Sequence, residues 1–212
     1  MKENKYDDNI FFQKYSQMSR SQQGLAGAGE WETLRKLLPD FKDKRVLDLG
    51  CGYGWHCIYA MEHGASSVVG VDISHKMLEV AKEKTHFPQV EYKCCAIEDV
   101  EFPEESFDVI LSSLAFHYVA DYEILVKKIY RILKSGGKLV FTVEHPVFTA
   151  YGTQDWHYNE KGEILHFPVD NYYYEGKRTA VFLGEKVTKY HRTLTTYLNT
   201  CLLYTSPSPR DR

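Results

Sequence analysis

A short glycine-rich segment is the part of this sequence whose residue types and spacing could do chemistry. The segment Asp48-Leu49-Gly50-Cys51-Gly52-Tyr53-Gly54 follows the apolar run 45–49 and precedes a stretch with helical character. Glycines at such a turn let the backbone approach a ligand closely and enter the helix tightly. We therefore predict that the loop 48–54 binds a ligand.

A carboxylate at the end of the next predicted strand narrows the choice of ligand. Asp72 ends the apolar run 68–72, about 20 residues after the loop, where a carboxylate can accept hydrogen bonds from both hydroxyls of a ribose. The loop and Asp72 together predict a ligand that contains a nucleoside.

The spacing of the glycines and the charge beside them indicate which nucleoside this is. A dinucleotide fingerprint reads G-x-G-x-x-G, whereas this loop reads G-x-G-x-G. Trp55 occupies the position where the fingerprint has its third glycine. Asp48 would repel a pyrophosphate and attract a ligand with an ammonium group. S-adenosylmethionine fits, since it carries a ribose, a sulfonium and an ammonium but no phosphate. The same spacing argues against an NAD-dependent oxidoreductase.

The elements that must position these residues alternate between strands and helices. Strands are predicted at 45–49, 68–72, 90–95, 107–111 and 138–143, and helices at 28–38, 54–63, 75–85 and 122–134. Ser135-Gly136-Gly137 is expected to end the last helix. Apolar strands that alternate with amphipathic helices predict an α/β fold, a Rossmann-like doubly wound and mostly parallel sheet.

The chain divides into five predicted segments. Residues 1–23 are expected to form an arm or lid, and 24–145 the cofactor-binding domain. Residues 146–192 are rich in aromatic side chains and form a predicted capping insertion, with antiparallel strands around 172–188. Residues 189–200 look helical, and 193–200 are taken as the start of a following helix region.

Residues 201–212 differ in sequence character from the rest of the chain and end in a segment rich in Ser and Pro. Their sequence corresponds to an in-frame translation of a transposon-type sequencing adapter. We interpret them as a non-native tail and expect the natural protein to continue beyond Thr200.

Composition excludes several classes of protein. The chain has 212 residues, 43% apolar, and a net charge of −3, so it offers no basic excess for nucleic acid. It has neither a run of 18 apolar residues nor a signal peptide, which argues against a membrane protein. Its five cysteines include no C-x-x-C pair and its nine histidines are scattered, so no metal site is expected. Reduced cysteines point to the cytoplasm.

Several blocks together resemble the class I S-adenosylmethionine-dependent methyltransferase family, and most closely its bacterial "methyltransferase type 11" group. The resemblance covers about residues 24–200. It rests on the blocks 46–54, 69–74, 96–99, 107–113, 133–137, 144–146 and 190–193. The family usually adds an antiparallel sixth and seventh strand, which are missing here.

The resemblance implies cofactor-binding roles for individual residues. Gly50 and Gly52 would line the methionine part of S-adenosylmethionine, and Ser113 and Leu114 would lie near its sulfonium. Ile97 and Glu98 would flank the adenine, although Ala96 stands where related sequences often carry an Asp that bonds the adenine amino group. The predicted cofactor-binding set is Asp48, Gly50, Cys51, Gly52, Gly54, Asp72, Ile73, Ile97, Glu98, Ser113 and Leu114.

Catalytic candidates follow from position alone. His117 follows the fourth predicted strand and His145 the fifth, and a neutral imidazole could take a proton from a hydroxyl, amine or thiol. Tyr15 and Arg20 in the arm could close over the cofactor. We expect methyl transfer to an O, N or S atom of a small molecule. A protein methyltransferase and a catalytically silent cofactor-binding partner protein remain alternatives, and the oligomeric state is open.

Overall fold

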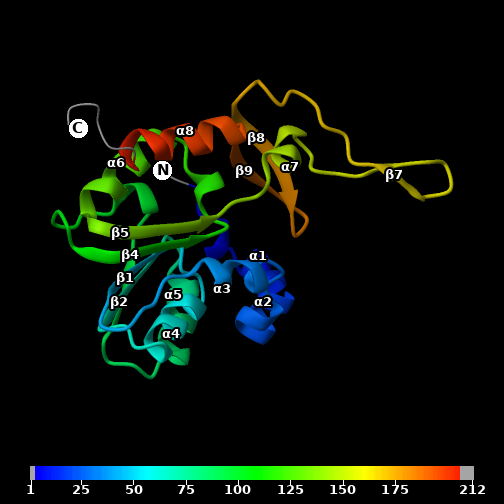
Figure 1. Ribbon diagram of the computed structural model, residues 1–212. Helices are drawn as coiled ribbons and strands as arrows, with labels where there is room; N and C mark the ends of the chain where they lie inside the picture. Colours follow the sequence, from blue (N-terminus) through cyan, green and yellow to red (C-terminus); the bar gives the residue numbers. More distant parts are fainter. Residues whose placement is uncertain (1–2, 206–212) are drawn as a thin grey trace. The chain divides into compact units, whose positions relative to one another are not determined.

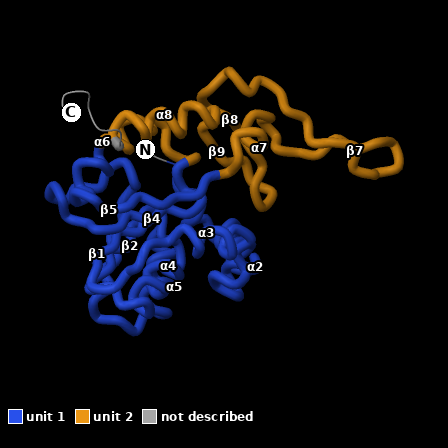
Figure 2. The backbone as a smooth tube through the Cα atoms, viewed as in Figure 1, with its two compact units in different colours: residues 1–116, 128–143 blue, residues 117–127, 144–212 orange. Residues whose placement is uncertain are grey.

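The computed structural model describes residues 3–205 and divides the chain into two compact units (Figure 2). Unit 1 consists of Met1–Phe116 and Lys128–Val143, and unit 2 of His117–Lys127 and Glu144–Arg212. This division differs from the predicted segments. The N-terminal residues belong to the same compact unit as the sheet, and the segment 117–127 joins the C-terminal part.

Unit 1 is built on a five-stranded parallel sheet with the strand order β3-β2-β1-β4-β5 (Figure 1). Its strands are β1 (Arg45–Leu49), β2 (Ser67–Asp72), β3 (Val90–Cys94), β4 (Phe107–Ser113) and β5 (Leu133–Thr142). The central strand β1 and its neighbour β2 are buried over most of their length, as their continuous apolar runs require. The predicted Rossmann-like α/β fold is confirmed.

The helices that follow β1 and β2 cover one face of this sheet (Figure 1). They are α4 (Trp55–Glu62) and α5 (His75–Lys84), and α3 (Trp31–Leu37) precedes the sheet in the chain. Ser74 caps α5 by accepting a hydrogen bond from the backbone N–H of Met77 at 3.1 Å, as predicted. Apolar side chains of α4 pack into a core cluster with those of β1 and β2.

The predicted boundary between the last helix and the fifth strand is wrong. The helix α6 (Tyr122–Ile132) ends earlier than expected, and β5 begins at once with Leu133. Leu133 pairs with Phe107, and the next pair joins Lys138 to Val109. The Ser135-Gly136-Gly137 segment is therefore an irregularity within strand β5, because residues on both sides of it pair with β4.

The N-terminal residues form short helices. They are the 3-10 helices η1 (Lys5–Asp7) and η2 (Gly24–Gly27), with α1 (Asn9–Ser16) and α2 (Ser19–Gln23) between them. Phe11 of α1 is fully buried. Asp7 accepts hydrogen bonds from the Ser74 hydroxyl at 2.6 Å and from the Lys76 backbone at 3.1 Å. The predicted arm is thus anchored to the start of α5.

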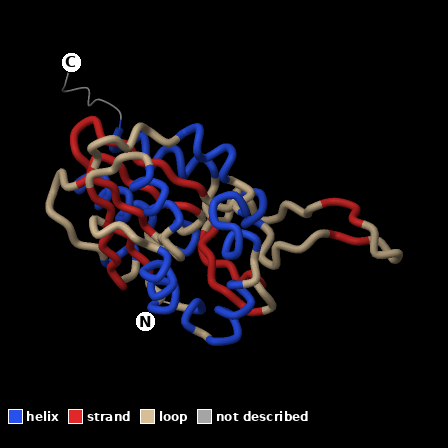
Figure 3. The backbone as a smooth tube through the Cα atoms, turned by 90° about the horizontal axis from the view of Figure 1, so that it is seen from below, coloured by secondary structure: helices blue, strands red, loops and turns tan. Residues whose placement is uncertain are grey.

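Unit 2 contains the first part of α6, two short antiparallel hairpins and, after β5, the helices α7 and α8. Its elements include α7 (Pro146–Ala150), β6 (His157–Tyr158), β7 (Ile164–His166), β8 (Gly176–Phe182), β9 (Glu185–His191) and α8 (Leu194–Thr205). Antiparallel strands were expected around 172–188, and β8 and β9 supply them. The helix predicted from 189 begins only at Leu194, because residues 189–191 still pair with β8. The β6–β7 hairpin extends away from the rest of this unit (Figures 1 and 3).

Helix α8 continues through residues 201–205, the first part of the suspected tail, and residues 206–212 lie outside the described residues. The origin of this segment therefore stays a prediction. Between residues 3 and 205, no helix is both long enough and apolar enough to cross a bilayer.

Candidate functional site

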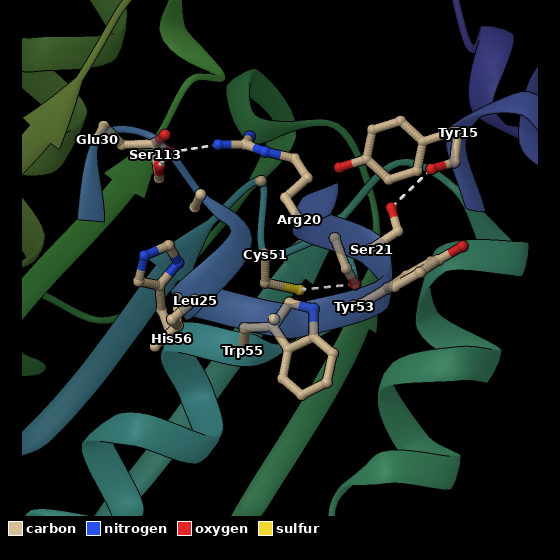
Figure 4. Close-up of a pocket in the computed structure, with 14 residues that line it drawn as sticks. Tyr15, Arg20, Ser21, Leu25, Glu30, Cys51, Tyr53, Trp55, His56 and Ser113 are labelled. Carbon is tan, nitrogen blue, oxygen red and sulfur yellow. Dashed lines mark hydrogen bonds and ion pairs between the residues drawn. The ribbon is translucent and has the colours of Figure 1, made fainter. Parts of the chain in front are cut away.

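A pocket in unit 1 lies where the glycine loop meets the N-terminal helices (Figure 4). The loop contributes Gly50, Cys51 and Gly52, and the end of β4 contributes Ser113. The remaining lining residues come from α1, α2, η2, the segment between η2 and α3, the end of the glycine loop and the first turn of α4. The structure therefore brings four predicted cofactor-binding residues together, and with them Tyr15 and Arg20, which were expected to close over the cofactor.

Two glycines of the loop have different structural roles. Gly50 adopts a φ of +81°, and a Cβ placed there would lie 2.5 Å from the Cβ of Ala115. Gly52 has a φ of +52°, and a Cβ placed there would meet no atom within 4 Å. Gly50 is thus required by packing, whereas Gly52 keeps open the space in front of the loop.

Asp72 is held in position at the end of β2 by the backbone. The N–H groups of Gly52 and Ser74 each donate to one of its carboxylate oxygens at 2.9 Å. Burial raises the pKa of Asp72, and these two backbone donors limit the rise. Because a carboxylate oxygen has two lone pairs, each oxygen can accept one further hydrogen bond, as two ribose hydroxyls would require.

Asp48 lies beneath the loop and does not line the pocket. Its side chain is 1% exposed, and the Cys57 thiol donates to its Oδ2 at 3.5 Å. Its Oδ1 has no hydrogen-bond partner among the described residues. Burial raises the pKa of Asp48 to about 7, so at neutral pH this carboxyl is only partly ionised.

An ion pair between Arg20 and Glu30 borders the pocket (Figure 4). Ser113 donates its hydroxyl to the same Glu30 oxygen at 3.0 Å. Burial acts to raise the pKa of Glu30, but its own backbone N–H and Arg20 outweigh burial and hold the pKa below its usual value. The pocket therefore presents an ionised carboxylate beside a guanidinium.

Sequence reasoning missed Glu30 and the start of α4 as pocket residues. Glu30 directly precedes α3, so it reads as an ordinary acidic residue at a helix N-terminus. In the sequence Trp55 is only a departure from the dinucleotide pattern, yet it lines the pocket, and its buried indole N–H has no hydrogen-bond partner within residues 3–205. His56 also lines the pocket, and burial lowers its pKa to about 4.

The residues expected around adenine lie on a 3-10 helix, η3 (Ile97–Asp99), that follows β3. The Cδ1 atom of Ile97 is 3.4 Å from the position of a Cβ on Gly50, so this side chain reaches the loop. The predicted set also contains residues that do not line the pocket, namely Asp48, Gly54, Asp72, Ile73, Ile97, Glu98 and Leu114. They lie on the glycine loop, on strand ends or on η3, and Asp72 is joined to the pocket by its hydrogen bond from Gly52.

Both catalytic candidates belong to unit 2. His117 is 2% exposed, its Nδ1 accepts from the Glu144 backbone at 3.5 Å, and its Nε2 is 4.0 Å from Glu144 Oε1. Burial lowers the pKa of His117 to about 4. His117 is therefore neutral at pH 7.

His145 caps α7, since its Nδ1 accepts from the Val147 backbone at 3.1 Å.

The part of the chain that the structure describes contains no recognisable metal-binding cluster. No group of three or more His, Cys, Asp or Glu side chains is placed there so that it could hold an ion.

Comparison with known proteins finds the same sequence pattern and fold in methyltransferases. Residues 47–141 match the family described as "Methyltransferase domain". The chain is 57% identical to a candidate S-adenosylmethionine-dependent methyltransferase from Listeria monocytogenes, with a TM-score of 0.80 and 83% of each chain covered. An S-adenosylmethionine-dependent methyltransferase from Mesorhizobium loti is 40% identical, with a TM-score of 0.79 over 86% of this chain and 83% of that one.

A curated enzyme matches about half of the chain. The ubiquinone biosynthesis O-methyltransferase of Coxiella burnetii is 36% identical over 112 residues, which is 52% of this chain. The match spans 47% of the length of that enzyme.

Proposed function

Because this chain belongs to the S-adenosylmethionine-dependent methyltransferases, we propose that it transfers the methyl group to an O, N or S atom of a small molecule. One observation carries the assignment of the cofactor to this pocket. Gly52 lines the pocket and also donates its N–H to Asp72 at 2.9 Å. A ligand with its amino-acid tail in the pocket and its ribose on Asp72 would therefore lie across Gly52.

The proposal assigns a role to each predicted cofactor residue. Gly50 and Gly52 border the methionine part, with Cys51 and Gly54 completing the loop. Asp72 accepts from the ribose hydroxyls, and Ile73 follows it. Ile97 and Glu98 flank the adenine, and Ser113 and Leu114 lie near the sulfonium. Asp48 supports the loop from beneath, since it is buried and does not line the pocket.

The residues of the chain need only bind, orient and exclude water. Bound S-adenosylmethionine supplies an electrophilic methyl carbon on a sulfonium sulfur. Where the acceptor carries a proton, we propose His117 and His145 as the candidates for its removal. The imidazole of His117 is neutral at pH 7, and the nitrogen that would take the proton is Nδ1, which accepts weakly from the Glu144 backbone at 3.5 Å. His145 is the other candidate. Its Nδ1 accepts from the Val147 backbone, so the neutral ring carries its proton on Nε2, and Nδ1 is the nitrogen that would take the proton once it leaves the cap of α7.

A small-molecule acceptor is supported by the curated relative, which is named for O-methylation in ubiquinone biosynthesis. The net charge of −3 offers no general attraction for nucleic acid. We propose a reducing cytoplasm as the location, because the spacing of the five cysteines in the sequence does not fit a disulfide framework.

Cofactor binding is tested by calorimetric titration with S-adenosylhomocysteine and with NAD. The wild-type protein is expected to bind the first and not the second. Asp72→Ala removes the proposed ribose acceptor and should weaken S-adenosylhomocysteine at least about tenfold, because hydrogen bonds to a charged group contribute about 1.5–3 kcal/mol.

The matched control is Asp40→Ala. Asp40 is exposed and also accepts from a backbone N–H, that of Lys42 at 3.0 Å. Its removal should leave the affinity unchanged. Equal affinities of the Asp72→Ala and wild-type proteins would refute the ribose role.

The acceptor class is tested by incubating the protein with methyl-labelled S-adenosylmethionine and pooled metabolites. Label in a small molecule supports the proposal. Label only in added protein would make the chain a protein methyltransferase. Tight S-adenosylhomocysteine binding with no transfer to any pool would identify a silent cofactor-binding protein.

A further inference from the structure

The pocket in unit 1 presents two opposite charges side by side. The guanidinium of Arg20 contacts the carboxylate of Glu30, and the two side chains are 24% and 21% exposed. An α-amino acid also carries opposite charges next to each other, on one carbon atom. The amino-acid tail is the part of S-adenosylmethionine with this pattern, because its adenosine has no ionised group at neutral pH.

Two carboxylates compete for the role of binding the ammonium of that tail. Asp48 is 1% exposed and does not line the pocket. Burial raises its pKa to about 7, so it offers only part of a charge. Glu30 lines the pocket and stays ionised, since the pKa of Glu30 is below its usual value. The charge that a cation would meet in the pocket is therefore that of Glu30.

The chain fixes Arg20 and Glu30 through close backbone packing. A Cβ on Gly27 would lie 2.3 Å from the backbone oxygen of Ser19, so η2 folds tightly back onto the start of α2. Gly24 packs against the Trp55 ring, and a Cβ there would lie 3.1 Å from it. Helix α2, which carries Arg20, is thereby seated against both the segment leading to Glu30 and the start of α4.

Ser113 connects this pair to the sheet. Its hydroxyl donates to Glu30 at 3.0 Å from the end of β4, which orients the carboxylate in the pocket. Arg20 has more N–H donors than Glu30 and Tyr15 use, because a guanidinium carries five. The pair can therefore take up a carboxylate on one side and an ammonium on the other.

We propose that Glu30, and not Asp48, binds the α-ammonium of the amino-acid tail of the cofactor, while Arg20 binds its α-carboxylate. The proposal rests on the proposed function, since it places S-adenosylmethionine in this pocket. It makes Arg20 and Glu30 the residues that distinguish an adenosyl ligand with a zwitterionic tail from one without it.

Calorimetric titration with four ligands tests this assignment. S-adenosylhomocysteine has both tail charges, decarboxylated S-adenosylhomocysteine keeps the amine, the deaminated analogue keeps the carboxylate, and 5′-methylthioadenosine has neither. Glu30→Gln should weaken the two amine-bearing ligands about tenfold or more and leave 5′-methylthioadenosine unchanged. Arg20→Gln should weaken the two carboxylate-bearing ligands instead.

Two further variants serve as controls. Glu32→Gln makes the same change on an exposed residue of α3 and should affect none of the four ligands. Asp48→Asn tests the competing carboxylate and should leave the preference for amine-bearing ligands intact. Thermal melting of each variant shows whether it is folded.

The outcomes separate this proposal from the proposed function. If wild-type protein prefers decarboxylated S-adenosylhomocysteine over 5′-methylthioadenosine and Glu30→Gln keeps that preference in full, the role of Glu30 is overturned while cofactor binding stands. Loss of the preference in Asp48→Asn alone, or equal weakening of all four ligands by Glu30→Gln, also overturns it. If the wild-type protein binds none of the four, both proposals fail.

Discussion

Each unit of the molecule contains a partly or fully buried ion pair, and the two pairs differ in how completely they are satisfied. In unit 1, Arg20 and Glu30 border a pocket. In unit 2, Lys189 is 4% exposed and contacts Glu144 at 2.5 Å. Gln154 closes a ring with them, donating to Glu144 and accepting from Lys189, each at 2.9 Å.

The difference indicates which pair can exchange partners. Lys189 is almost fully buried, and Gln154 bonds to both Lys189 and Glu144, so the three side chains satisfy one another and the cation is not accessible to a ligand. Arg20 keeps spare donors toward a pocket, so it can bind a further group. The same pairing chemistry thus serves stability in unit 2 and recognition in unit 1.

Breaking the pair in unit 2 should have the largest effect on stability. Lys189→Met leaves Glu144 without its cation in a mostly buried site, which should lower the free energy of unfolding by about 3 kcal/mol. Urea unfolding followed by circular dichroism measures the change. The control is Lys186→Met on the same strand, β9, where the side chain is exposed. A loss no larger than that of the control would show that the ring is not structural.

The second prediction concerns acid, and sharpens the role of burial in unit 2. Burial lowers the pKa of His117 to about 4 in the folded state, from 6.5. The unfolded chain therefore binds the proton more strongly, and the stability contributed by neutral His117 is complete above pH 6.5 and lost as the pH falls toward 4. Between pH 7 and 4.5 this amounts to about 2 kcal/mol.

The measurement is urea unfolding of wild-type and His117→Gln proteins across that pH range. The variant should lose about 2 kcal/mol less than the wild type on acidification. Parallel pH profiles for the two proteins would contradict the neutral, buried imidazole.

Breaking the pair in unit 1 should have the smallest effect on stability. Arg20→Gln should lower the free energy of unfolding by less than about 1 kcal/mol, because both side chains retain contact with solvent. Urea unfolding beside Lys189→Met provides the direct comparison. A loss as large as that of Lys189→Met would mean that the Arg20–Glu30 pair is structural and would remove the contrast between the units.

Features encoded by local sequence were predictable. The glycine loop, the acid at the end of β2 and the cap Ser74 follow from neighbouring residues, and the parallel sheet follows from apolar strands separated by helices. The extent of β5 was not, because Leu133 pairs with a strand that lies earlier in the chain. Its glycines read as a helix end when they are seen without that partner.

The pocket itself depends on contacts between distant residues, which a single sequence does not display. Glu30 and Ser113 are 83 positions apart, yet they share a hydrogen bond. Asp48 is next to the loop in the sequence, but its side chain is buried beneath the loop, against Cys57 of α4. Proximity along the chain therefore points to Asp48, whereas the carboxylate that lines the pocket is that of Glu30.

The structure of the protein determined with S-adenosylhomocysteine tests the central claim most directly. The account predicts density across Gly52, with the ribose hydroxyls on Asp72 and the amino-acid tail between Arg20 and Glu30. Density for the ligand elsewhere, or a tail that leaves the Arg20–Glu30 pair untouched, would contradict it.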